Sequence, residues 1–194
     1  MKRSNKFVTG LTLIALSLTS IPALAHTGAT VEASLLSGFL HPFTGFDHLL
    51  AMLAVGFWAA QQTGQKTLAI PATFIITLIL GFSIALSGIT LPGVESGIAT
   101  SVLILGFLII SATQLSATAA LPLIAIFALF HGFAHGAELG AASAGLFAIG
   151  FIAASALLHI TGVASSHSIT RMMPVAHKLI GGFLSVSGAI FLLS

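Results

Sequence analysis

The 194-residue sequence contains no cysteine, and this absence excludes several kinds of chemistry. Without thiols the chain forms no disulfide, has no thiolate nucleophile and offers no cysteine ligand to zinc or to an iron–sulfur cluster. Charged residues are also scarce, at 5% of the sequence, whereas soluble domains have roughly 25%. No basic patch or platform of aromatic residues predicts binding to a nucleic acid.

Hydrophobic residues make up 57% of the sequence, and several runs of about 20 residues carry no charge. This composition predicts an all-α, polytopic bundle of membrane helices in a lipid bilayer. Lys2, Arg3 and Lys6 precede an apolar stretch, and Ala23-Leu24-Ala25 resembles a cleavage site. We therefore expect a signal peptide at residues 1–25 and a transmembrane domain at 26–194; the alternative is an uncleaved first helix.

The mature sequence predicts six spans, at residues 34–60, 68–86, 97–112, 120–138, 141–164 and 178–193. The first span is expected to be broken near Pro42 and Gly45, because both residue types interrupt helices. The stretch from Ser165 to Lys178 is the most polar connection and is predicted to be a loop.

The distribution of charges predicts the orientation in a bacterial plasma membrane. If the leader is cleaved, residue 26 lies outside, and six crossings return the C-terminus to the same periplasmic side. The basic residues Lys66, Arg171 and Lys178 then lie on the inner side, as the positive-inside rule requires. The acidic residues of the connecting segments lie on the outer side, namely Glu32, Glu95 and Glu138.

Two polar clusters interrupt the apolar spans, and the predicted topology brings both to the outer side. One lies around the break in the first span and contains His41, Asp47 and His48. The other ends the fourth span, where the i, i+4 and i+7 spacing places His131, His135 and Glu138 on one helix face. A carboxylate inside a membrane span, as Asp47 would be at mid-membrane, needs a compensating partner.

Imidazole and carboxylate ligands suit divalent ions such as nickel, cobalt and zinc. The lack of thiolates disfavours Cu(I), but the thioether of Met52 is a possible copper ligand, so copper stays an alternative. The positive end of a helix dipole at Asp47 opposes a cation there, and the full charge of the carboxylate must outweigh it. The alternative to a metal site is that these groups pair only with one another or with backbone carbonyls.

Three further features concern the rest of the chain. Gly132, Gly136 and Gly140 form a stripe of small residues that allows close packing of another helix. His159 lies alone in the fifth span, as either an inner metal ligand or a core histidine. His26 would become the mature N-terminus, where its imidazole and α-amine either chelate a metal or form a flexible end. His167 and His177 are expected to be solvated.

Three motifs resemble the signatures of the HupE/UreJ family of nickel/cobalt permeases. They are His-Pro-Phe-Thr-Gly-Phe-Asp-His in the first span, Phe-His-Gly-Phe-Ala-His-Gly-Ala-Glu in the fourth and Gly-Phe-Ile-Ala-Ala-Ser-Ala-Leu-Leu-His-Ile-Thr-Gly in the fifth. The resemblance covers essentially the whole chain and implies secondary uptake of Ni²⁺ or Co²⁺, with no tightly bound cofactor. The metal-handling positions that it implies are His41, Asp47, His48, His131, His135, Glu138 and His159.

Two other classes of function use the same residue types. A membrane-embedded metalloenzyme, a hydrolase or an oxygenase, would use the His/Glu cluster, but the His-Glu-x-x-His order is absent. A bis-histidine haem protein leaves the two carboxylates unexplained. No Gly-x-x-x-x-Gly-Lys motif occurs, so the chain itself is not expected to hydrolyse ATP. The sequence indicates no ATPase subunit and leaves the oligomeric state open.

Overall fold

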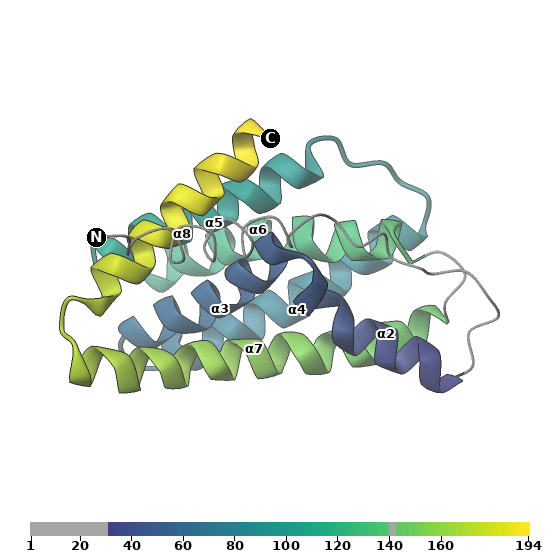
Figure 1. The fold of residues 1–194 in the computed structure, drawn as a ribbon. Helices are drawn as coiled ribbons and strands as arrows, with labels where there is room; N and C mark the ends of the chain where they lie inside the picture. Colours follow the sequence, from purple (N-terminus) through teal and green to yellow (C-terminus); the bar gives the residue numbers. More distant parts are fainter. Residues whose placement is uncertain (1–30, 140–142) are drawn as a thin grey trace, which may run out of the picture.

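The protein is helical throughout the residues that its computed structural model describes, which are 31–139 and 143–194. These residues contain no strand and form α2 (Val31–Thr44), α3 (Phe46–Gln61), α4 (Lys66–Leu86), α5 (Val94–Ile110), α6 (Ala117–Ala137), α7 (Ala144–Met172) and α8 (Ala176–Leu193) (Figure 1). The predicted all-α fold is therefore confirmed. The expected signal peptide and His26 lie outside the described residues.

Four of these helices, α4, α6, α7 and α8, are long and apolar enough to cross a membrane. The pair formed by α2 and α3 passes the same test jointly and is bent by 83°. The predicted break in the first span is thus confirmed; it lies at Gly45, while Pro42 lies inside α2. The remaining predicted span corresponds to α5, an apolar helix of 17 residues, so the described residues contain four or five candidate spans.

Glycine lies at the closest approach of α4 and α6. A Cβ atom on Gly132 would overlap the carbonyl oxygen of Leu78, and one on Gly81 would overlap that of Leu129. The predicted packing role of the small-residue stripe is confirmed for Gly132 and Gly136, whereas Gly140 lies outside the described residues. The same contact recurs at Gly38 and Gly150 between α2 and α7, at Gly56 and Gly162 between α3 and α7, and at Gly106 and Gly181 between α5 and α8.

These contacts predict a large difference between two glycine-to-alanine substitutions. We expect Gly132→Ala to destabilise the protein by about 1–3 kcal/mol, because the new methyl group forces two helix backbones apart. Gly182→Ala in α8 meets no atom within 4 Å and should be neutral or slightly stabilising. Melting temperatures of the two purified variants in detergent measure the difference, and equal values would contradict the packing role of Gly132.

The fifth predicted span ends later than expected. Residues 165–178 were predicted to form a loop, but α7 continues to Met172, and Met173–Val175 connect it to α8. Side chains in this extension bond back to the preceding turn, as in the hydrogen bond between Nδ1 of His167 and the Val163 oxygen at 3.0 Å. The Thr170 hydroxyl likewise donates to the Ser166 oxygen. The polar residues are thus compatible with a helix because their polar atoms find partners on it.

Candidate metal site

The break at Gly45 brings the ends of three helices together. His41 lies in the last turn of α2, His135 lies in the last turn of α6, and Asp47 lies in the first turn of α3. The C-terminus of a helix carries a partial negative charge, so α2 and α6 both favour a cation between them. The N-terminus of α3 opposes a cation, and the carboxylate of Asp47 offsets it. The break in the span therefore adds the C-terminus of α2, whose partial negative charge favours a cation, to the site.

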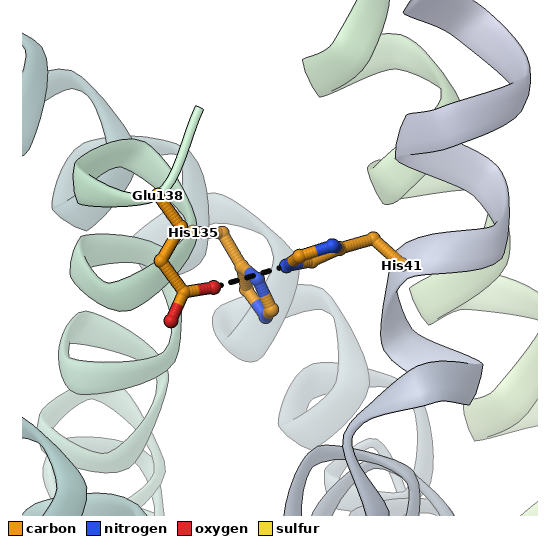
Figure 2. Close-up of side chains that lie close together, drawn as sticks. All are labelled: His41, His135 and Glu138. Atoms are coloured by element: carbon orange, nitrogen blue, oxygen red, sulfur yellow. Dashed lines mark hydrogen bonds and ion pairs between the residues drawn. The ribbon is translucent and has the colours of Figure 1, made fainter. Parts of the chain in front are cut away.

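His41, His135 and Glu138 form the tightest group of metal-ligating side chains in the described residues. One ligand atom from each lies within 4.8 Å of the others. The His41 and His135 rings are 4.6 Å apart between centroids, and Nε2 of His41 donates to Oε2 of Glu138 at 3.2 Å. Figure 2 shows the three side chains converging from α2 and from the end of α6. This spacing suits the binding of one metal ion by all three side chains.

Glu138 lies one residue beyond α6 and caps its C-terminus. The hydrogen bond from His41 lowers the pKa of the Glu138 carboxyl below its ordinary value, and this effect exceeds the opposing one of partial burial. The side chain is therefore a carboxylate at neutral pH. It supplies a negative charge at the exposed edge of the group.

Asp47 and His48 form a second pair next to this group. Oδ1 of Asp47 accepts hydrogen bonds from both the backbone N–H and Nδ1 of His48, each at 2.8 Å. Because Nδ1 carries the proton, Nε2 of His48 presents a free lone pair, and this nitrogen is buried without a partner. A carboxylate that orients an imidazole in this way is the usual support for a metal-ligating histidine.

The imidazoles continue from this pair towards the middle of the bundle. The ring of His48 lies 4.4 Å from that of His135 and 5.2 Å from that of His131. Nδ1 of His131 donates to the Phe127 carbonyl oxygen at 2.8 Å, which again leaves Nε2 as the free nitrogen. His41, His135, His48 and His131 thus form a row of neighbouring rings contributed by α2, α3 and α6.

The free nitrogens of this row are costly to bury. Leaving one buried hydrogen-bonding atom without a partner costs about 1–3 kcal/mol. The buried imidazole nitrogens without a partner among the described residues are Nε2 of His48, Nε2 of His131, and both nitrogens of His135 and of His159. So many unpaired ligand atoms in one region favour a site that binds a ligand over a tightly paired core.

His159 lies apart from the other predicted ligands. The ring of Phe74 contacts both His159 and the row, with centroids 5.5 Å from His131 and 5.0 Å from His159. The predicted residues thus fall into six near the break and one deeper position on α7. His131, His135 and Glu138 belong to α6 and its C-terminal end, and their partners come from other helices: His135 and Glu138 meet His41, and His131 lies next to His48.

Three phenylalanines that sequence analysis did not single out line the histidines. Phe151 lies 4.1 Å from the ring of His135, Phe147 lies 5.3 Å from that of His41, and Phe74 is described above. Nothing in the sequence distinguishes them from other apolar residues of the spans. Their effect is to keep the imidazoles dry, which strengthens the interaction of each free nitrogen with a cation.

Comparisons with known proteins agree with the motifs. A family model described as "HupE / UreJ protein" matches residues 14–191. Protein HupE of Rhizobium leguminosarum bv. viciae is 39% identical over 183 residues, which cover 93% of this chain and 95% of that protein. No solved structure matches the chain.

Proposed function

Because the chain belongs to the HupE/UreJ family, we propose that it is a permease that takes up a divalent transition metal, Ni²⁺ before Co²⁺. The family and the HupE relative indicate a transporter and not an enzyme. No feature of the described residues favours the metalloenzyme alternative. The observation that carries the proposal is the row of four imidazoles, three of which are buried with free nitrogens, flanked by two carboxylates.

We assign capture of the ion to His41, His135 and Glu138, with His48 as the next ligand inwards. Glu138 is half exposed and His135 is buried, so an ion would enter from the Glu138 side and lose water as it moves towards His48. Two carboxylates and several imidazoles match the charge and the ligand preference of Ni²⁺ and Co²⁺. His131 and then His159 would follow along the route, and Phe74 contacts both rings.

We further infer six crossings, with α2 and α3 as one broken span and α5 as the third. With 17 residues, α5 reaches about 26 Å, at the lower limit for a transmembrane helix. Lys66 at the start of α4, Arg171 at the end of α7 and Lys178 at the start of α8 would then lie on the inner side. In this arrangement the leader is cleaved after residue 25, and both ends of the mature chain lie on the outer side. The membrane potential would favour inward movement of the cation by ~2.3 kcal/mol per charge per 100 mV.

The proposal is tested by uptake of radioactive nickel in cells that lack their own nickel importers. Cells that express the full chain should accumulate nickel above cells with an empty vector, and excess unlabelled Co²⁺ should compete. His167→Ala is the matched control, since this histidine is exposed on α7, away from the row. If neither nickel nor cobalt accumulates while the protein is present in the membrane, the permease proposal is wrong.

The inner position of His159 predicts a distinct kinetic effect. His159→Ala should lower the maximal uptake rate by about tenfold, equivalent to ~1.4 kcal/mol of added barrier, because the ion loses a ligand beyond Phe74. The apparent KM should stay close to that of the wild type, because the ligands near the break are unchanged. The concentration dependence of initial uptake rates separates the two parameters. A raised KM with an unchanged maximal rate would place His159 in the capture step instead.

A further inference from the structure

An apolar groove without a histidine in its lining opens between α3, α7 and α8. Figure 1 shows α8 diverging from α7 after the short connection between them, and the close packing of α8 is on α5, through Gly106 and Gly181. The space left between α8 and its other neighbours is a groove of about 390 Å³. Leu53 and Phe57 of α3 and Leu179 and Phe183 of α8 line it, and Ser165 of α7 supplies the one polar side chain of the lining.

Two basic residues without an ion pair among the described residues follow the groove lining along α7 and precede it on α8. Arg171, in the last turn of α7, and Lys178, in the first turn of α8, are both exposed, and neither forms an ion pair with a residue that the structure describes. Lys178 directly precedes Leu179 of the lining, and Arg171 follows Ser165 by six residues, about 9 Å along a helix. The sequence contains no Asp or Glu after Glu138.

We propose that this groove binds one anionic phospholipid, with an acyl chain along the apolar lining and its phosphate beside Arg171 and Lys178. Leu179 and Phe183 are 64% and 54% exposed on the open side of the groove, where a single acyl chain would cover them. A basic pocket between membrane helices on the inner side is the type of site that holds anionic headgroups. Met172, at the end of α7, and Met173, in the connection, are both exposed, which suits a position against lipid.

A second copy of the chain is a poorer occupant of the same groove. A twofold interface would bring the same surface of both copies together. Arg171 and Lys178 of one copy would then approach those of the other, without an acidic residue in the C-terminal part of the sequence to compensate. An anionic lipid instead neutralises these charges while filling the groove.

Native mass spectrometry of the full chain, purified in detergent and titrated with lipid, tests this proposal. Phosphatidylglycerol should bind more tightly than phosphatidylcholine with the same acyl chains. Each Lys or Arg near such a headgroup contributes about a fivefold factor in affinity, so the double variant Arg171→Gln/Lys178→Gln should weaken phosphatidylglycerol binding about 30-fold. Lys66→Gln is the charge-matched control, because Nζ of Lys66 is engaged by the Leu115 carbonyl oxygen at 2.7 Å, outside the groove.

A second variant tests the groove rather than the charges. Ser165→Phe should displace the bound phosphatidylglycerol by filling the groove, without removing a charge. Equal binding of the two lipids, or phosphatidylglycerol binding that neither the double variant nor Ser165→Phe weakens, would overturn the proposal. A dimer that forms without added lipid and is disrupted by Ser165→Phe would also overturn it, by assigning the groove to a second copy. None of these readouts depends on metal transport.

Discussion

Replacing His135 with alanine should reduce nickel uptake to the background of cells without the protein. His135 is the one side chain in contact with both parts of the site, with ring centroids 4.6 Å from His41 and 4.4 Å from His48. Its loss removes one ligand of the group formed by His41, His135 and Glu138. It also removes the ring that connects this group to the Asp47–His48 pair. The loss of uptake should exceed the about 10–100-fold effect of removing a residue that only supports a ligand.

The His135 prediction needs a control for folding, because a 1%-exposed side chain is being truncated. His135→Gln keeps most of the volume but not the imidazole, so it should lose uptake while keeping a melting temperature closer to that of the wild type. His167→Ala removes an exposed histidine and should leave uptake unchanged. Nickel uptake by His135→Gln at the rate of the wild type, at equal amounts in the membrane, would remove His135 from the proposed route.

Replacing Asp47 with asparagine should raise the apparent KM for nickel by about 10–100-fold. The carboxylate accepts two hydrogen bonds from His48 and thereby fixes which ring nitrogen is free. An amide also accepts a hydrogen bond, but it is uncharged, so His48 becomes a weaker ligand and the positive end of α3 is no longer offset. Initial uptake rates over a range of nickel concentrations measure this change.

Asp47→Glu separates the charge from the geometry at this position. It keeps the negative charge but moves the carboxylate by one methylene relative to His48. We expect an apparent KM between those of the wild type and of Asp47→Asn. If Asp47→Asn transports nickel with an unchanged KM, orientation of His48 by Asp47 is not part of metal capture.

Much of the fold follows from local features of the sequence. Long uncharged apolar runs predict helices, because a chain in a bilayer must satisfy its backbone hydrogen bonds internally. Gly45 and Pro42 predicted the broken span, and its 83° bend confirms it. The predicted end of the fifth span was wrong, because polarity at residues such as His167 predicts a loop, whereas these side chains bond to carbonyl oxygens of the helix itself.

The sequence by itself determined that histidines and carboxylates concentrate at the break in the first span and at the end of the fourth. Only the tertiary structure decided which of them meet: His135 and Glu138 contact His41 of α2, His131 contacts His48 of α3, and His159 contacts Phe74. Helical periodicity assigns a residue to a face of its own helix, but not to a partner across the bundle. That choice depends on the depth and rotation at which helices pack, and these are set by long-range contacts such as those of Gly132 with Leu78.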